Sequence, residues 1–190
     1  MSPLEIGGFV LSVLAVWLTA RQHILCWPVG IASVIVYAVV FIEVKLYSDA
    51  GLQVVFAVLQ VYGWIVWLKT GPAPGLQRPV GRTGAQTGGI LLLLGCAGTG
   101  ALGYTMATYT DAALPYWDAG TTAFSLVGQW LTAKKAIECW PVWIAVDVIY
   151  IGIYLVKDLQ LTAFLYAIFI ALAIYGWREW HSAFRRPLTA

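Results

Sequence analysis

The sequence predicts an all-α integral membrane protein, in which seven transmembrane helices form two parallel three-helix repeats joined by a linking helix. Of the 190 residues, 61% are hydrophobic and only 11% are charged, whereas a soluble domain has roughly a quarter of its residues charged. The apolar runs are also long, and a spanning helix needs about 20 mostly apolar residues. A repeated pattern of Trp, Pro and Tyr supplies the third observation, because it divides the chain into two similar halves.

Breaks between the apolar runs predict seven spans, at 4–20, 26–43, 50–68, 86–104, 118–134, 138–156 and 160–181. The first residues carry Glu5 and no Lys or Arg, so we expect the first span to be retained rather than cleaved as a signal peptide. The longest connection, Lys69 to Thr87, is rich in Gly and Pro and is predicted to be a flexible loop between the halves. The resulting units are 1–68, the loop and linking helix at 69–117, and the second repeat with its tail at 118–190.

The basic residues predict the orientation in the membrane. Cytoplasmic loops carry an excess of Lys and Arg. With seven spans, nine of the eleven basic residues fall on the side of the C-terminus: Arg21, Lys69, Arg78, Arg82, Lys134, Lys135, Arg178, Arg185 and Arg186. Only Lys45 and Lys157 fall on the other side. We therefore expect the N-terminus outside and the C-terminus in the cytoplasm.

The internal repeat has a constant offset of 113 residues, since Trp27-Pro28-Val29 recurs as Trp140-Pro141-Val142 and 140 − 27 = 113. The same offset aligns the segment 17–20 with 130–133 and the segment 62–64 with 175–177. Two triplets joined directly would be inverted, and the extra span at 86–104 makes them parallel. The predicted arrangement is three helices, one helix and three helices, as in SWEET-like transporters, which bind substrate near the midplane between their repeats.

Several repeated residues have structural explanations. Pro28 and Pro141 stand where a helix begins and needs no backbone donor. Gly63 and Gly176 are expected to allow close packing between helices. Five tryptophans near span ends are predicted to be interfacial anchors: Trp27, Trp64, Trp67, Trp177 and Trp180.

A binding site is expected where the two repeats differ. Gly30 is replaced in the second repeat by Trp143, and Val34 by Asp147. Trp140, Trp143 and Asp147 are spaced i, i+3 and i+7, so they share one helical face. An acid near the centre of a span costs roughly 2.5–3.5 kcal/mol on insertion scales, so Asp147 is expected to face a cavity or a partner. A bond to a neighbouring Ser or Tyr, or a shallower position, is the alternative.

Other polar side chains extend this candidate site. Thr122, Ser125 and Gln129 share a face of the span 118–134 with Asp118, although Ser and Thr also serve as contacts between helices. Gln53 and Gln60 lie seven residues apart on one face. Tyr37 and Tyr150 are duplicated and are either scaffold or a source of hydroxyls. The predicted substrate-binding residues are Trp140, Trp143, Asp147, Gln129, Gln53, Thr122, Ser125 and Tyr150.

The residue types predict the kind of substrate. Two indoles can sandwich a flat ring and favour a cation over their faces, while Gln amides and a carboxylate can bind hydroxyls. A planar cationic heterocycle carrying a sugar fits this set. The net charge of +2 does not indicate nucleic-acid binding.

Other classes of protein fit the sequence less well. The two histidines, His23 and His181, lie near span ends, so no enzyme active site is predicted within the membrane. A channel subunit would show its polar stripe in both halves. Cys26, Cys96 and Cys139 lack metal-ligand spacing and are expected to be packing residues. No metal or cofactor is expected.

The chain resembles the Pnu family of bacterial vitamin transporters over nearly its whole length, and is most similar to the members that carry nicotinamide riboside. The similar segments are residues 114–118, 129–130, 134–138 and 161–166, together with the motif W-x-x-W-x-x-x-N/D at Trp140, Trp143 and Asp147. The resemblance implies uptake of nicotinamide riboside, a precursor of NAD, by facilitated diffusion through a homotrimer in the bacterial inner membrane. Relatives that carry thiamine or another vitamin leave a different vitamin as the alternative substrate.

Overall fold

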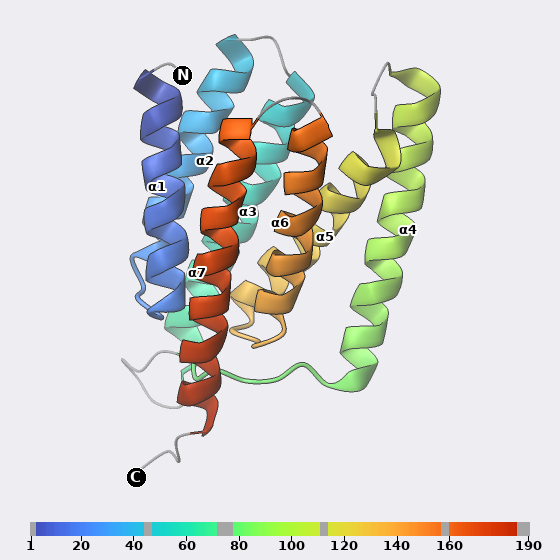
Figure 1. Ribbon diagram of the computed structural model, residues 1–190. Helices are drawn as coiled ribbons and strands as arrows, with labels where there is room; N and C mark the ends of the chain where they lie inside the picture. Colours follow the sequence, from blue (N-terminus) through green and yellow to red (C-terminus); the bar gives the residue numbers. More distant parts are fainter. Residues whose placement is uncertain (1–2, 44–46, 72–77, 111–113, 157–159, 186–190) are drawn as a thin grey trace.

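The computed structural model describes residues 3–43, 47–71, 78–110, 114–156 and 160–185, and at 47–49, 161 and 162 it describes the backbone alone. Within these ranges the chain forms seven helices and is all-helical, as predicted (Figure 1). They are α1 (Pro3–Ala20), α2 (Cys26–Glu43), α3 (Tyr47–Lys69), α4 (Ala85–Tyr109), α5 (Pro115–Ala133), α6 (Cys139–Val156) and α7 (Gln160–Arg185).

The predicted spans match these helices within a few residues at most ends. The largest difference is at the end of α4, which continues to Tyr109 instead of stopping at 104. Residues 104–109 contain no Gly or Pro, and the hydroxyl of Thr105 donates to the carbonyl of Ala101 at 2.6 Å. Such a bond within the helix satisfies the hydroxyl, so the polar threonine does not end the helix.

Five of the helices in the described part of the chain are long and apolar enough to cross a membrane: α1, α2, α3 from Ala50, α4 and α6. The helices α5 and α7 are not among them. In α5 the reason is visible in the sequence, since Asp118, Thr122, Ser125 and Gln129 interrupt its apolar residues.

The loops before α2 and α6 are the same turn used twice. Gln22 and Lys135, which are 113 residues apart, both have a positive φ, 56° and 55°. After each of them a backbone N–H returns to the preceding helix, from His23 to Leu18 at 2.9 Å and from Ala136 to Leu131 at 3.0 Å. This local geometry reverses the chain within five residues and sends α2 and α6 back into the bundle.

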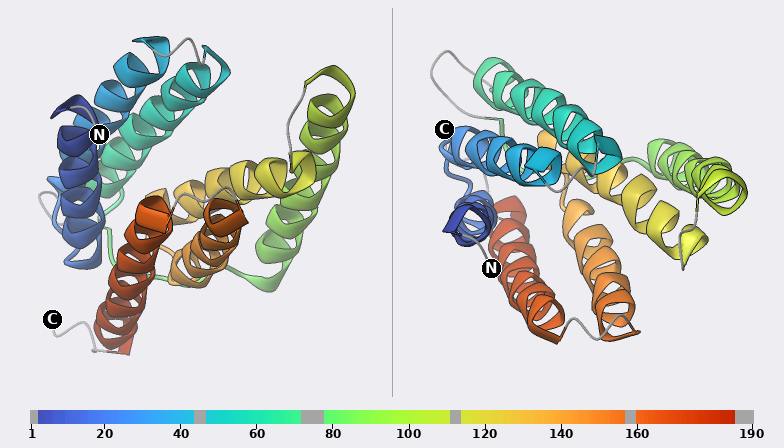
Figure 2. Two further views of the ribbon diagram at one scale, coloured as in Figure 1. Left: turned by 45° about the horizontal axis from the view of Figure 1, so that its top comes forward. Right: turned by 90° about the horizontal axis from the view of Figure 1, so that it is seen from above.

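The helices form two groups that meet along two seams. In one group α2 packs against α1 and α3, and in the other α6 packs against α5 and α7. The groups meet where α1 lies against α7 and where α3 lies against α5 (Figure 2). In the described part of the chain α4 packs only against α5 and stands at the outside of the bundle (Figures 1 and 2). The loops before α2 and α6 lie at the lower end in Figure 1, where α7 also ends.

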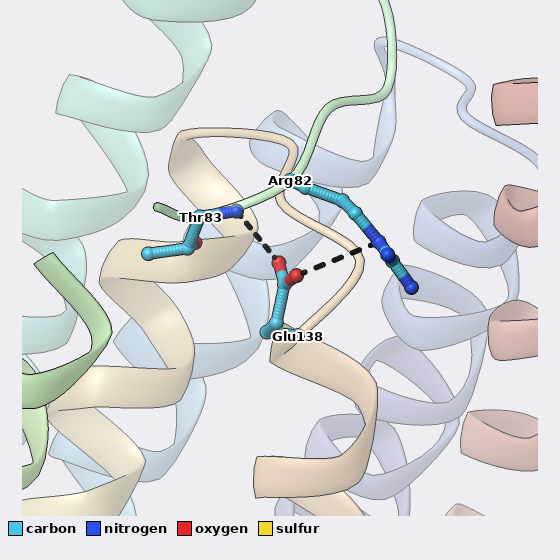
Figure 3. A network of polar contacts seen from close by, with 3 residues as sticks. All are labelled: Arg82, Thr83 and Glu138. Carbon is cyan, nitrogen blue, oxygen red and sulfur yellow. Dashed lines mark hydrogen bonds and ion pairs between the residues drawn. The ribbon is translucent and has the colours of Figure 1, made fainter. Parts of the chain in front are cut away.

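The segment 78–83, within the connection predicted to be flexible, is held on the loop before α6. Gly81 exchanges two backbone hydrogen bonds with this loop, from its N–H to Lys135 and from Ile137 back to its carbonyl, both at 3.0 Å. The Arg78 guanidinium donates to the carbonyl of Lys134 at 2.8 Å. The Glu138 carboxylate accepts the N–H of Thr83 at 3.0 Å and lies 4.0 Å from Arg82 (Figure 3). The prediction of a flexible loop is therefore wrong for this segment, and residues 72–77 lie outside the described residues.

Four tryptophans form one buried cluster: Trp27, Trp67, Trp140 and Trp180. Ring centroids are 5.2 Å apart in the pair Trp27–Trp67 and again in the pair Trp140–Trp180, both edge-on, and Trp67 and Trp180 join the pairs at 6.1 Å. A Cβ on Gly63 would overlap the Trp27 ring, and one on Gly176 would overlap the Trp140 ring. The prediction that these glycines allow close packing is confirmed, and the group that packs against each of them is an indole ring.

The cluster corrects the interfacial-anchor prediction for Trp27, Trp67 and Trp180, which are at most 2% exposed. Trp67 and Trp180 pack across the seams between the two groups, and Trp27 packs against α3 within the first group. The sequence position near a span end does not reveal such contacts. Trp177 is 42% exposed and Trp64 is half-buried, so for these two the anchor interpretation stays a prediction.

Candidate substrate cavity

A cavity of about 420 Å³ lies between the two groups of helices. Small-molecule sites typically measure about 300–1,000 Å³. All eight residues predicted to bind substrate line it, namely Trp140, Trp143, Asp147, Gln129, Gln53, Thr122, Ser125 and Tyr150. The structure thus brings together residues from α3, α5 and α6.

Trp143 is the best-positioned aromatic side chain of the site. Its indole N–H donates to the hydroxyl of Thr132 at 3.1 Å, and that hydroxyl donates to the carbonyl of Gly128 at 2.8 Å. A Cβ on Gly128 would lie only 3.1 Å from the ring, so the glycine makes room for the indole beside α5. Both the orientation and the depth of Trp143 are therefore determined by α5.

Trp140 borders the cavity but belongs mainly to the tryptophan cluster. It is 2% exposed and packs against Gly176 and Trp180. The expected sandwich of a ring between two indoles is therefore not available in this conformation, because the Trp140 ring is already enclosed. Trp143 is the indole that can stack on a substrate.

Asp147 lies in the cavity wall and is 6% exposed. Among the described residues its carboxylate has no hydrogen-bond or ion-pair partner, so the alternative of a bond to a neighbouring Ser or Tyr has no support there. A carboxylate held away from water is costly unless it is paired. The group is suited to a ligand that brings a positive charge or hydrogen-bond donors.

Three glutamines, Gln53, Gln60 and Gln129, also line the cavity. Among the described residues none of these amides has a hydrogen-bond partner, which leaves donors and acceptors for a ligand. Gln60 was not among the eight predicted residues, although it shares a helical face with Gln53. Its amide occupies the space beside Gly30, where a Cβ would overlap its oxygen.

Tyrosines form the wall on the side of the second group. Tyr150 stacks on Tyr154 with centroids 5.8 Å apart, and Tyr166 lies 4.8 Å from Tyr150 and 5.2 Å from Tyr154. Tyr154 and Tyr166 were not among the predicted residues, although both differ from their repeat partners, Phe41 and Gln53. Tyr37 stacks on Phe41 at 6.1 Å and lies close to Gly8. Of the two duplicated tyrosines, Tyr37 therefore belongs to the scaffold, and Tyr150 lines the cavity.

The opposite side of the cavity is lined by α1 and α2. Ser12, Ala15, Thr19, Gly30 and Ser33 all face it. The hydroxyls of Ser12 and Ser33 are 2.7 Å apart, and the Thr19 hydroxyl donates to the carbonyl of Ala15 at 2.8 Å. These residues carry no charge, and sequence comparison of the repeats singled out only Gly30 among them.

Lys135 lies beside the tryptophan cluster, in the loop before α6. Its side chain is buried, and its amine stands 4.4 Å from the centroid of the Trp67 ring. Burial lowers the pKa of Lys135 to about 8, and the nearby Cys26 thiol opposes this shift. No group of three or more His, Cys, Asp or Glu residues in the described part of the chain could hold a metal ion.

Comparison with known proteins adds independent evidence. The family model described as nicotinamide mononucleotide transporter matches residues 2–182. The nicotinamide riboside transporter PnuC of Escherichia coli (strain K12) is 25% identical over 97% of this chain and 87% of its own length. The riboflavin/roseoflavin transporter RibM of Streptomyces davaonensis is 26% identical over 96% of this chain and 86% of its own length. The crystal structure of the vitamin B3 transporter PnuC has the same fold, with a TM-score of 0.76 and 22% identity over 95% of this chain and 81% of that chain.

Proposed function

Because this chain belongs to the nicotinamide mononucleotide transporter family, we propose that it carries nicotinamide riboside into the cell by facilitated diffusion. The relatives named PnuC support this substrate at 25% identity over nearly the whole chain. The family and these relatives are membrane transporters, and we propose no enzymatic activity for the chain. The substrate would be held in the cavity between the two groups of helices.

The observation that carries the proposal is the pairing of Asp147 with Trp143. The carboxylate has no partner among the described residues, and the indole stands one helical turn away on the same face. Nicotinamide riboside has a flat, permanently cationic pyridinium ring joined to a sugar. A cation over an indole face gains about 0.5–2 kcal/mol, depending on how far it is desolvated. The carboxylate supplies the balancing charge.

We further propose that the two groups of helices are parallel repeats, in an arrangement of three, one and three helices. Paired contacts support this. The indole N–H of Trp67 donates to the carbonyl of Thr132 at 3.2 Å, and that of Trp180 donates to the carbonyl of Thr19 at 3.1 Å. Trp180 is the repeat partner of Trp67, and Thr132 is the repeat partner of Thr19, so each bond is the repeat equivalent of the other. This is expected for repeats related by an axis along the membrane normal.

For the orientation we propose an outside N-terminus and a cytoplasmic C-terminus in the bacterial inner membrane. The support is the excess of Lys and Arg on one side of the seven helices. The tryptophan cluster would then lie between the cavity and the cytoplasm. The resemblance to the Pnu family supports a homotrimer.

A transporter of another vitamin is the second candidate. The relative that carries riboflavin matches this chain about as well as the PnuC proteins do, and thiamine is a cationic alternative. The isoalloxazine ring of riboflavin is neutral, so it would leave Asp147 without a counter-charge. The site favours a cationic vitamin.

Calorimetry in detergent with nicotinamide riboside, thiamine and riboflavin tests the substrate. We expect nicotinamide riboside to bind most tightly, and Trp143→Ala and Asp147→Ala each to weaken it by at least about tenfold, since a hydrogen bond to a charged group contributes about 1.5–3 kcal/mol. Unchanged affinity in both variants would overturn the site assignment. Tighter binding of thiamine or riboflavin would overturn the substrate.

Uptake into liposomes that contain the purified protein tests facilitated diffusion. We expect labelled nicotinamide riboside to equilibrate without accumulating, and an imposed proton or sodium gradient to leave the final level unchanged. Accumulation above the external concentration, with the membrane potential abolished by valinomycin in equal potassium, would show ion coupling instead.

A further inference from the structure

The side of the cavity that the first group of helices supplies, called the first lobe below, differs from the equivalent side in the second group. This first lobe is lined by Ser12, Ala15, Thr19, Gly30, Ser33 and Gln60, from α1, α2 and α3. In the second group the equivalent of Gly30 is Trp143, whose indole packs over Gly128 and bonds to Thr132. Gly128 and Thr132 are the equivalents of Ala15 and Thr19, so in the second group an indole fills the space that corresponds to the one the Gln60 amide occupies beside Gly30.

The side chains that face Gly30 and Trp143 differ in size in the opposite direction. Gln60 of α3 corresponds to Ala173 of α7, since 173 − 60 = 113. The pair Gly30–Gln60 is thus small and large, whereas the pair Trp143–Ala173 is large and small. In the first lobe the large side chain is an amide, and it reaches the cavity from α3 over the glycine of α2.

The first lobe is polar without being charged. Among the described residues the Gln60 amide has no partner, so its N–H groups and its oxygen are free for a ligand. The oxygens of Ser12, Ser33 and Thr19 take part in local hydrogen bonds and keep acceptor capacity. Groups that both donate and accept at close spacing are suited to the hydroxyls of a sugar.

We propose that the first lobe receives the sugar end of the substrate, with Gln60 as the hydrogen-bonding residue and Gly30 as the residue that positions it. The inference rests on the proposed function, because a nucleoside-like substrate has one flat cationic end and one polyhydroxylated end. Trp143 and Asp147 on α6 would bind the flat cationic end. The first lobe provides for the second end on the opposite side of the cavity.

The test compares two ligands and a double-mutant cycle. Nicotinamide riboside carries the sugar, and 1-methylnicotinamide has the same cationic ring without it. We expect Gln60→Ala and Gly30→Ala each to lower the affinity for nicotinamide riboside roughly tenfold, the range for loss of one or two hydrogen bonds. The affinity for 1-methylnicotinamide should change less than about twofold on the same scale. Because Gly30 acts through Gln60, the double variant should bind no more weakly than Gln60→Ala alone.

Gly30→Ala is a mild change for the fold, since the clashing atom is the end of a flexible side chain. Gly152→Ala in α6 is the matched control, because a Cβ there meets nothing within 4 Å. We expect this control to bind both ligands like the wild type. Size-exclusion profiles and melting temperatures in detergent establish that each variant is folded.

The outcomes separate the two proposals. If wild-type protein binds nicotinamide riboside but Gln60→Ala binds it equally well, or loses both ligands in parallel, the assignment of the first lobe is wrong and the proposed function stands. Additive losses in the cycle overturn the positioning role of Gly30. If the affinity for 1-methylnicotinamide is too weak for direct calorimetry, it is measured by displacement of labelled nicotinamide riboside. Wild-type protein that binds neither ligand overturns the proposed function itself.

Discussion

The tryptophan cluster and the cavity wall differ in how closely the two halves of the chain match. In the cluster each half supplies a tryptophan pair with centroids 5.2 Å apart, each over its own glycine. In the cavity wall the repeat partners differ, since Gly30 corresponds to Trp143 and Val34 corresponds to Asp147. The helices that pack the two halves together are thus nearly symmetric, while the surface offered to a ligand is not.

This difference follows from the tasks of the two regions. Contacts that hold two similar helix groups together can be repeated, because each group meets the other in the same way. Arg21 and Lys134 show this, since the Arg21 guanidinium donates to the Tyr175 hydroxyl at 3.3 Å and the Lys134 amine lies 5.2 Å from the Tyr62 ring. A ligand with two chemically different ends instead needs two different walls. The duplicated chain supplies the first requirement, and we propose that the substitutions in one copy supply the second.

Replacing Asp147 by the residue of its repeat partner is expected to have the largest effect. Asp147→Val should lower the affinity for nicotinamide riboside by roughly 10- to 100-fold, because it removes the charge that balances the ring. Calorimetry in detergent measures the loss. Val148→Ala, which changes the exposed neighbour on α6, is the control and should bind normally. Full affinity in Asp147→Val would show that the difference between the walls does not serve the ligand.

The second prediction concerns the glycines of the tryptophan cluster. Gly63→Ala and Gly176→Ala should each reduce the free energy of unfolding by about 1–3 kcal/mol, because the new methyl group overlaps a rigid buried indole. For a chain of this size that is a fall of roughly 2–10 °C in melting temperature. The two variants should behave alike, and Gly30→Ala, which meets a flexible amide, should be clearly milder. Unequal losses at 63 and 176 would contradict the symmetry of the cluster.

The sequence was sufficient to predict the helices and a set of eight residues that all line the cavity. Apolar runs separated by polar or Pro-containing breaks determined the helices, because a spanning helix has to satisfy its backbone internally. The mismatches of the repeat led to Trp143 and Asp147, since a costly group inside a membrane persists where a cavity or ligand needs it. Both arguments depend on single helices or on pairs related by one offset.

What the sequence did not reveal depends on contacts between helices. Trp67 and Trp180 lie near span ends in the sequence, where an interfacial anchor is also expected. They are buried because the two groups of helices pack together along the seams. The space beside Gly30 was visible, but its occupation by Gln60 depends on the rotation of α3 against α2. Lys135 counted as a cytoplasmic charge, and its burial follows from the approach of Trp67.

Lys135 provides the third prediction, because its repeat partner is the uncharged Gln22. Burial lowers its pKa in the folded protein to about 8, below the ordinary lysine value of 10.5. The unfolded chain therefore binds more protons between these values, so stability should rise as the pH increases from about 8 to 10 and be lowest below pH 8. Lys135→Gln should remove this dependence and raise the free energy of unfolding at neutral pH by about 1–2 kcal/mol, which appears as a higher melting temperature. Melting curves in detergent from pH 7 to 10 test it, and an unchanged slope in the variant would contradict the assignment.

The smallest effect is expected for Glu138→Leu, which lies outside the tryptophan cluster and the cavity wall. Glu138 helps to hold the segment 78–83 on the loop before α6. Glu138 has Leu25 as its repeat partner, so the bond to Thr83 and the ion pair with Arg82 exist on one side only (Figure 3). The ion pair is long and more than a third exposed on both partners, and such pairs contribute roughly 0–1 kcal/mol. Two backbone bonds at Gly81 and the Arg78 bond would remain in Glu138→Leu. We therefore expect a loss of less than about 1 kcal/mol in stability and normal binding of nicotinamide riboside. A large loss of binding with an intact melting temperature would show that this attachment, present on one side only, also controls the cavity.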